Sequence, residues 1–277
     1  MNHPFLPPQP PANATCKVID FTTSDPPLPA YKNCLAALIE NALTEAECKE
    51  LLRIAEASTI DPLAPSASPK WDRAMINMGG GRQALAVEER NCGRVILDTP
   101  EIADKLLARL RPFLRDLDME RLEDRRFVTG PGGNQKVFRL TRLNERLRFL
   151  KYVGGEYFRP HWDGMYKTPD GRERSYFTLH FYLNADGQQD WKELVRANTA
   201  EKRGAKVENP DADGKLLGGA TSFLLPFVKE EEERHVRIFP KVGSVLVFQQ
   251  RDLLHGGDSV FRGTKYTLRT DVMYEQE

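Results

Sequence analysis

The sequence contains few cysteines and no long apolar run. Its four cysteines (Cys16, Cys34, Cys48 and Cys92) are far apart and form no Cys-x-x-Cys pair, so neither a disulfide framework nor a cysteine zinc site is expected. No apolar run approaches the roughly 18 residues of a transmembrane helix, and the first residues lack the apolar stretch of a signal peptide. We therefore expect a soluble, cytoplasmic protein with reduced thiols.

An excess of charge of one sign is also missing. Forty basic residues balance forty acidic ones, so the formal net charge is zero. This balance argues against a protein that binds nucleic acid or a membrane surface through a bulk positive field, and we expect neither partner. Apolar residues make up 40% of the 277 residues, which is enough for a folded core and excludes disorder of the whole chain.

Proline is concentrated at the start of the chain, where residues 1–30 hold eight of the 19 prolines. Such a segment cannot donate a regular ladder of hydrogen bonds, so we expect an extended arm that behaves as a disordered tail. Residues 31–277 are expected to form a single domain. Its helical support should cover about 31–130 and its β core about 135–275.

Two helices are predicted in the first half of the chain. Thr44 and Glu47 have the spacing of a capping box, and Thr99 and Pro100 combine a cap residue with a proline in the first turn; an apolar stripe follows each pair. From about residue 135 the apolar pattern has a period of two, which predicts strands. The expected strands are 136–140, 146–153, 176–183, 220–225, 235–239, 244–249 and 265–274. This order indicates a mainly β fold in which helices back a β-sandwich or jelly roll.

Two polar inserts interrupt the predicted strands. Residues 164–175 are rich in glycine, proline and charge, and residues 184–217 are long and polar. Loops of the second length in a compact domain are usually lids, functional excursions or disordered segments. We expect both inserts to lie at the rim of a site and residues 164–175 to be mobile without substrate.

Two of the five histidines have informative neighbours. His161 and Asp163 stand at positions i and i+2, which point to the same face of an extended chain. His255 follows an apolar strand that ends near Phe248. Two imidazoles and one carboxylate form the facial triad that suits divalent iron and leaves coordination positions open for catalysis. A His-x-Asp pair alone is a weak signal, because a surface histidine beside an acid is common.

Three sequence blocks surround these residues. Tyr152 is followed by paired glycines and then by the His-x-Asp pair, a Gly-Gly-x-Thr stretch begins at Gly218, and Lys265 stands ten residues after His255. In this order the blocks resemble the prolyl-4-hydroxylase-like branch of the Fe(II)/2-oxoglutarate dioxygenases. The resemblance covers roughly 145–275 and implies a double-stranded β-helix (jelly roll) packed against the N-terminal helices.

The resemblance also implies roles for individual residues. It makes the two histidines and the aspartate (His161, Asp163 and His255) the catalytic iron ligands. It implies that Lys265 pairs with the distal carboxylate of 2-oxoglutarate, since a buried carboxylate needs a charge-assisted partner. Arg269 lies four residues further along the same strand face and is the second candidate for this role. The alternative for Arg269 is an ion pair with an acid such as Asp271.

Five further side chains are expected near the site. Tyr152 matches a family tyrosine beside the cosubstrate, and its alternative is a core tyrosine with a satisfied hydroxyl. Tyr182 resembles a strand tyrosine that reaches the cosubstrate carboxylate in some relatives, and His180 on the same face is expected to be an interior histidine rather than a fourth ligand. Arg90 and Arg94 could add charge to a substrate wall, although solvent-exposed arginines are the commoner outcome.

The implied activity is an oxygenase that hydroxylates or otherwise oxidises an unactivated C–H bond while 2-oxoglutarate is decarboxylated to succinate. The substrate would be an amino-acid-like compound, another small molecule, a peptide or a protein. Fe(II), 2-oxoglutarate and O2 are the implied cofactors, and the resemblance allows ascorbate. A non-catalytic jelly-roll binding module and a cupin-type metal enzyme without 2-oxoglutarate are the alternatives. The complete ligand set argues against the first, and the position of Lys265 argues against the second.

Overall fold

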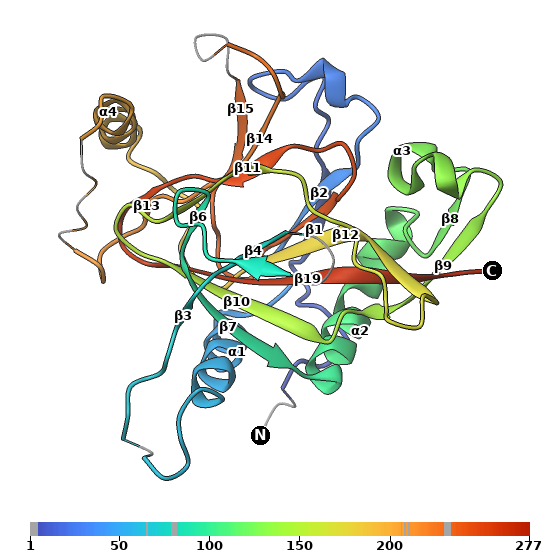
Figure 1. The fold of residues 1–277 in the computed structure, drawn as a ribbon, viewed down its shortest axis with the longest axis horizontal. Coiled ribbons are helices and arrows are strands. Elements are labelled where there is room, and N and C mark those ends of the chain that lie inside the picture. The colour runs from blue at the N-terminus through green and yellow to red at the C-terminus, as the bar shows by residue number, and fades with distance from the viewer. Residues whose placement is uncertain are drawn as a thin grey trace.

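Two antiparallel β-sheets form the centre of the molecule (Figure 1). The computed structural model describes residues 5–64, 66–78, 82–205, 207, 209, 211–229 and 234–277. In spatial order, the larger sheet contains β1 (Thr15–Val18), β2 (Ala36–Glu40), β16 (Val245–Gln249), β12 (Glu173–Tyr182), β19 (Lys265–Gln276), β10 (Arg146–Tyr152), β7 (Gly93–Asp98) and β3 (Asp72–Arg73), with β9 (Val137–Leu143) on β19 and β8 (Arg121–Glu123) on β9. The smaller sheet contains β15 (His235–Ile238), β14 (Thr221–Leu224), β17 (His255–Gly257), β11 (Tyr157–His161) and β6 (Arg90–Asn91).

Short pairs and helices complete the described fold. Two two-stranded ribbons pair β13 (Leu217–Gly218) with β18 (Val260–Arg262) and β4 (Ile76–Asn77) with β5 (Gln83–Ala84). The helices are α1 (Glu45–Ala57), α2 (Pro100–Asp116), α3 (Arg126–Thr129) and α4 (Trp191–Lys202), with 3-10 turns at Pro29–Tyr31 and Pro131–Gly133. The expected mainly β fold with flanking helices is confirmed.

The two faces of the larger sheet are buried in different ways. Helices α1 and α2 cover one face (Figure 1), and their apolar stripes pack on alternate strand residues such as Phe149 and Leu268. Residues between these, such as Arg148 and Lys265, point to the opposite face because side chains alternate along a strand. That face meets the smaller sheet, where Phe248 packs against Phe223. The inner face between the two sheets is therefore the place where polar strand residues gather.

All seven strands predicted by alternation are present, and both predicted helices are capped as expected. Thr44 and Glu47 form a complete capping box, and the Thr99 hydroxyl accepts from the backbone N–H of Ile102. The insert 184–217 was predicted as a loop, and this prediction is wrong because α4 occupies its middle. Helix α4 lies beside the sandwich (Figure 1) and has one fully buried side chain, so its apolar signal in the sequence is weak.

The described part of the proline-rich segment packs against the larger sheet and is not a free tail. Strand β1 pairs with β2 at the end of the larger sheet, and Leu6, Phe21 and Leu28 are fully buried. Arg109 on α2 holds the start of this segment, because its Nε donates to the carbonyl oxygen of Pro7 at 2.7 Å. Proline prevents a regular ladder but leaves apolar side chains free to enter the core.

Arg109 also makes the most deeply buried ion pair of the helical layer. Its side chain is only 1% exposed, and its Nη2 lies 2.7 Å from Oε1 of Glu47. We expect Glu47→Ala to lower the free energy of unfolding by about 3–5 kcal/mol, since it leaves a buried guanidinium without its partner. The matched control is Glu45→Ala on the same helix, where the pair with Lys49 is exposed to solvent and should contribute little to stability. Equal urea midpoints for the two variants would contradict this prediction.

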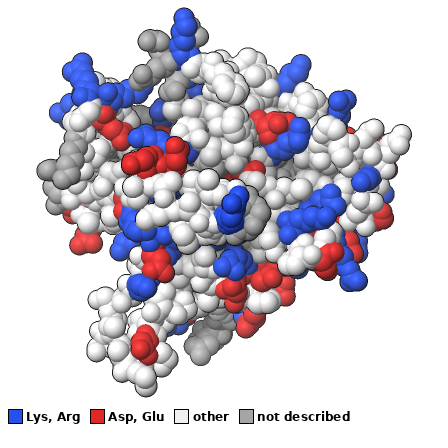
Figure 2. Space-filling model, in the orientation of Figure 1, with Lys and Arg blue, Asp and Glu red and all other residues white. Residues whose placement is uncertain are grey.

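The surface agrees with the absence of a dominant charge. Basic and acidic side chains are interspersed over the face of the molecule in Figure 2. The four cysteines are free, as predicted. Within the described ranges, no helix has both the length and the apolar character needed to cross a membrane.

Candidate metal centre

The three residues of the predicted triad meet at one end of the smaller sheet. His161 ends β11, His255 begins β17, and the two histidines are register partners across this antiparallel pair. Asp163 follows β11 and places its carboxylate between them: Oδ1 lies 3.7 Å from Nε2 of His161, and Oδ2 lies 3.6 Å from Nε2 of His255. The three ligand atoms are all within 4.8 Å of one another, which is a spacing that one metal ion can bridge.

Hydrogen bonds orient both imidazoles for metal binding. Nδ1 of His161 lies 2.8 Å from the carbonyl oxygen of Arg159, and Nδ1 of His255 lies 3.1 Å from that of Leu253. A carbonyl only accepts, so we assign the proton to Nδ1 in each ring, which leaves the Nε2 lone pair facing Asp163. Both rings are also fixed by packing, since Phe158 stacks on His161 at 3.6 Å between ring centroids.

The electrostatics of the triad favour the protonation states that a metal needs. Burial raises the pKa of Asp163, but the attraction of Arg269 and of the two histidines outweighs it and holds this pKa well below its usual range. Burial, with repulsion from His161, lowers the pKa of His255 to about 4. At neutral pH the site therefore contains an ionised carboxylate and a neutral His255, and both can coordinate a cation.

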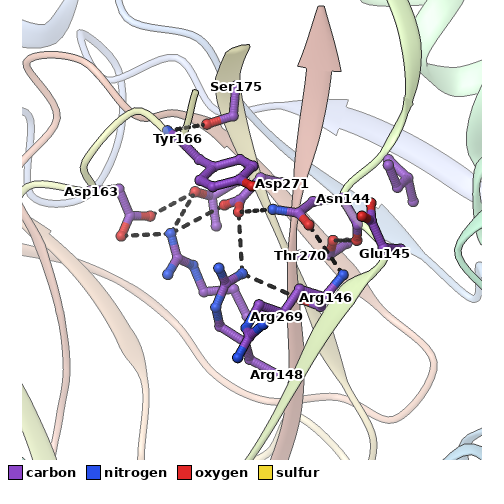
Figure 3. Close-up of polar contacts among 12 residues, drawn as sticks. Asn144, Glu145, Arg146, Arg148, Asp163, Tyr166, Ser175, Arg269, Thr270 and Asp271 are labelled. Carbon is purple, nitrogen blue, oxygen red and sulfur yellow. Dashed lines mark hydrogen bonds and ion pairs between the residues drawn. The ribbon is translucent and has the colours of Figure 1, made fainter. Parts of the chain in front are cut away.

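Arg269 is in direct contact with Asp163 of the triad. Its Nη2 lies 2.9 Å from Oδ1 of Asp163 and 3.3 Å from Oδ1 of Asp271, so the expected ion pair with Asp271 forms together with a second one. Thr178 donates to Oδ2 of Asp163 at 2.6 Å, and both carboxylate oxygens thus have a donor. Asp271 also lies 3.2 Å from Nη1 of Arg148, and Figure 3 shows Arg148 and Arg269 side by side next to Asp271.

The surroundings of Lys265 differ from those of Arg269. Its side chain is buried, with Nζ 5.0 Å from the ring centroid of its register partner Tyr152. Within the described part of the chain its ammonium makes no hydrogen bond or ion pair, and burial lowers its pKa to about 8. Gly219 lies close by with a positive φ of 69°, and a Cβ there would come within 3.2 Å of the lysine stem. The lysine is a buried cation without an ion-pair partner among the described residues; Asp258 attracts it only from a distance and is itself paired with Arg237.

Residues 147–270, from β10 to β19, match the sequence pattern of the 2OG-Fe(II) oxygenase superfamily. This stretch holds the whole triad, Lys265 and Arg269. These residues are slightly less than half of the chain, and over them it is similar to that superfamily. No curated protein matches the chain in sequence. The two antiparallel sheets, with the candidate triad at the ends of two neighbouring strands, agree with the double-stranded β-helix that the resemblance implied.

Three solved structures are similar to this chain at low sequence identity. The viral collagen prolyl hydroxylase of Paramecium Bursaria Chlorella virus-1, in its 2OG complex, is 18% identical, with 87% of this chain and 96% of that chain covered and a TM-score of 0.45. A Pseudomonas putida prolyl-4-hydroxylase is 16% identical, with 86% and 91% covered and a TM-score of 0.43. A Trichoplax adhaerens prolyl hydroxylase, in complex with a hypoxia inducible factor peptide fragment, is 15% identical, with 93% and 82% covered and a TM-score of 0.42.

Two more predicted residues lie on the inner face between the two sheets. The hydroxyl of Tyr182 donates to Oγ1 of Thr221 at 2.8 Å, and burial raises the pKa of this tyrosine. His180 is the register partner of Arg269 on β12 and lies outside the group of three that could hold a metal. Burial and the charge of Arg269 hold the pKa of His180 well below its usual range, so it is a neutral interior histidine.

The exposure expected for two arginines is wrong, and three supporting residues were not predicted. For Arg90 and Arg94, solvent exposure was given as the commoner of two alternatives, the other being a substrate wall, but they are only 6% and 8% exposed. Their strands, β6 and β7, pair with strands far away in the chain, and no local pattern reveals this burial. Thr178, Gln250 and Asp271, which support Asp163 and Arg269, were also missed as a network. The only signal for them in the sequence is that Thr178 and Asp271 share the inward phase of their strands.

Proposed function

We propose that the protein is an active Fe(II)- and 2-oxoglutarate-dependent oxygenase that hydroxylates or otherwise oxidises an unactivated C–H bond of an amino-acid-like, peptide or protein substrate. The observation that carries the proposal is the pairing of two features. Three ligand atoms with suitable protonation states converge on one point, and a buried lysine without an acidic partner lies on the facing sheet. A non-catalytic binding module would need neither the converging ligand atoms nor the buried lysine.

The donor set fits a divalent iron ion. His161, Asp163 and His255 would hold it through two imidazole nitrogens and one carboxylate oxygen, and three positions would stay open for cosubstrate and oxygen. Arg269 and Thr178 would keep the Asp163 carboxylate in place, because each donates to a different oxygen. When bound, Fe(II) and 2-oxoglutarate supply the oxidising chemistry, in which O2 is consumed and succinate and carbon dioxide are released.

Lys265 is the residue of the chain best suited to the distal carboxylate of 2-oxoglutarate. Arg269 already faces two carboxylates, Asp163 and Asp271, whereas Lys265 has none within the described residues. A buried ammonium is stabilised when an anion enters beside it. Tyr152 would form the wall next to this pair, since Lys265 lies over its ring.

The substrate would enter beside Asp163. A cavity of about 250 Å³ opens there, and its lining includes Asp163, Ser175, Gln250 and Arg251. Residues 164–175 border this cavity as a hairpin in which the amide of Ser175 donates to the carbonyl of Tyr166. Trp162, Met165 and Tyr166 are exposed nearby and offer an apolar surface for excluding water from a bound substrate.

Succinate formation tests the proposed activity directly. With 2-oxoglutarate and O2, we expect the protein to form succinate slowly even without its substrate, and this turnover should stop when the metal is removed by a chelator. Fe(II) should restore it, whereas Zn(II), which binds the same ligands but has no redox chemistry, should not. Equal succinate formation with Zn(II) or with chelator present would contradict the proposal.

The pKa of Lys265 predicts a pH dependence of cosubstrate affinity. Because this pKa is about 8 in the ligand-free protein, the ammonium is lost as the pH rises above 8, and with it the charge that attracts the carboxylate. We expect the dissociation constant of 2-oxoglutarate to rise by up to about tenfold per pH unit above 8. Lys265→Arg keeps its charge throughout this range and should flatten the profile. The measurement is calorimetric titration with Mn(II) in place of Fe(II), and a flat profile for the unmodified protein would contradict the prediction.

A further inference from the structure

Basic side chains form a row across three neighbouring strands on the inner face of the larger sheet. Arg148 on β10 is the register partner of Arg269 on β19, and Arg94 on β7 pairs with Leu150, two residues beyond Arg148. Arg90 of the smaller sheet stacks on the Phe158 ring at 4.4 Å. Burial, together with repulsion from Arg90 and Arg148, lowers the pKa of Arg94, as expected if these guanidinium groups face one another.

Few acids balance these cations. Arg148 and Arg269 share the single carboxylate of Asp271, at 3.2 and 3.3 Å. Arg94 donates only to neutral oxygens, the Gln83 side chain at 3.2 Å and the Met75 carbonyl at 3.4 Å. Among the described residues, neither Arg90 nor Arg94 forms an ion pair, although both are more than nine-tenths buried. The Nε atoms of Arg90 and Arg269 are also buried without a hydrogen-bond partner.

The surplus of positive charge persists when the site is loaded. In the described chain, four cations on this face (Arg94, Arg148, Lys265 and Arg269) and Arg90 of the smaller sheet stand against two carboxylates (Asp163 and Asp271). A divalent iron and the 2-oxoglutarate dianion cancel each other, so three positive charges are left over. Nearby Glu156 does not reduce this excess, because it is paired with Arg73 at 2.7 Å. Buried charge without a partner is costly, and a bound anion removes that cost.

We propose that Arg94 and Arg148 bind an acidic group of the substrate, so that the oxygenase acts on an anionic substrate with a carboxylate, sulfonate or phosphate. The inference rests on the proposed function, because it takes the protein to be a working oxygenase. The planar guanidinium fork suits oxyanions of all three kinds. Strand β7 is two strands away from β19, and Arg94 is offset from Arg269 by two residues along the strands, so their Cα atoms lie about 12 Å apart across the sheet. Arg269 in turn contacts Asp163. This span fits a small acid or the acidic group of one residue in a peptide.

Anion binding to the loaded protein tests this assignment. The full chain is saturated with Mn(II) and the 2-oxoglutarate analogue N-oxalylglycine, so that the probe cannot occupy the cosubstrate site. Thermal unfolding is then followed with sodium sulfate, sodium phosphate or sodium acetate against sodium chloride at equal ionic strength. We expect at least one oxyanion to raise the Tm by about 2–4 °C. The anion that acts at the lowest concentration identifies the acidic group.

Variants separate the site from a general salt effect. Arg94→Gln and Arg148→Gln should each lose the oxyanion shift, and Arg94→Gln should also raise the Tm without anion, because it removes a buried cation that has no acidic partner. Arg94→Lys keeps the charge and should retain part of the shift. The control Arg139→Gln, at an exposed position on β9, should retain all of it. A general stabilising effect of sulfate on the folded state would instead raise the Tm of every variant equally.

Two outcomes would overturn the inference. One is the absence of any oxyanion shift in the unmodified protein, and the other is an equal shift in Arg94→Gln. Calorimetric binding of Mn(II) and N-oxalylglycine is measured first and reports on the proposed function alone. Loss of that binding refutes the oxygenase, whereas intact binding without an oxyanion shift refutes only the anionic substrate.

Discussion

Replacement of any one of His161, Asp163 and His255 by alanine is expected to abolish Fe(II)-dependent conversion of 2-oxoglutarate to succinate. Each variant leaves two protein ligands for an ion that the triad would hold with three, and no other described His, Cys, Asp or Glu belongs to the group that could bind it. The expected loss is complete within the detection limit. The measurement is succinate formation alongside the iron content of each purified variant.

The histidine next to the triad provides a matched control. His180 is also an interior histidine on the inner face, but it does not belong to the group that could hold a metal. His180→Gln should keep its iron and its substrate-independent succinate formation. A triad variant that retains iron and turns over at a near-normal rate would refute the ligand assignment.

Lys265→Ala is expected to raise the KM for 2-oxoglutarate at least a hundredfold. The change leaves the distal carboxylate of the cosubstrate buried without its charged partner, which costs about 3–5 kcal/mol. The kcat at saturating cosubstrate should change much less, because Lys265 does not contact the triad. Lys265→Arg should recover most of the affinity. The measurement is the dependence of succinate formation on 2-oxoglutarate concentration.

Arg269→Ala is expected to affect kcat and metal binding, in contrast to the effect of Lys265→Ala on KM. Arg269 holds Oδ1 of Asp163, so its loss should lower kcat and weaken metal binding while the KM for 2-oxoglutarate changes by only a few fold. If Arg269→Ala instead has the larger effect on KM, Arg269 anchors the cosubstrate and the argument from the ten-residue spacing of Lys265 is wrong.

The sequence predicted those elements whose signal is local. Strand β19 alternates inward Lys265 and Arg269 with core-facing Leu268, and this period of two is visible without a structure. Strand β11 was not predicted, because it is short and contains Pro160. Helix α4 was missed because only Leu194 is fully buried, although Asp190 caps its first turn in the expected way.

The site residues that could be predicted are those that share a strand face or that stand at a spacing known from a family. His161 and Asp163 required only the geometry of an extended chain, whereas His255 required the resemblance to a family. The burial of Arg94 depends on the pairing of β7 with β10, which are separated by α2 and more than 40 residues. Pairing between such distant strands has no signature within either segment, so the basic row emerges only from the folded structure.

The docked N-terminal segment has a practical consequence for anyone who prepares this protein. Phe21 packs on Phe223 at 5.3 Å, and Phe223 lies 6.3 Å from the ring of His255. The hydroxyl of Tyr31 donates to the carbonyl of Leu224 and accepts from the amide of Leu254, the residue before that histidine. A preparation that has lost its first 30 residues to proteolysis, or an expression plasmid shortened to remove them as a dispensable tail, would remove Phe21 from behind the candidate metal ligand His255 and leave Tyr31 at a cut end. Poor iron retention in such a sample would report on the missing segment and say nothing about the chemistry of the intact enzyme.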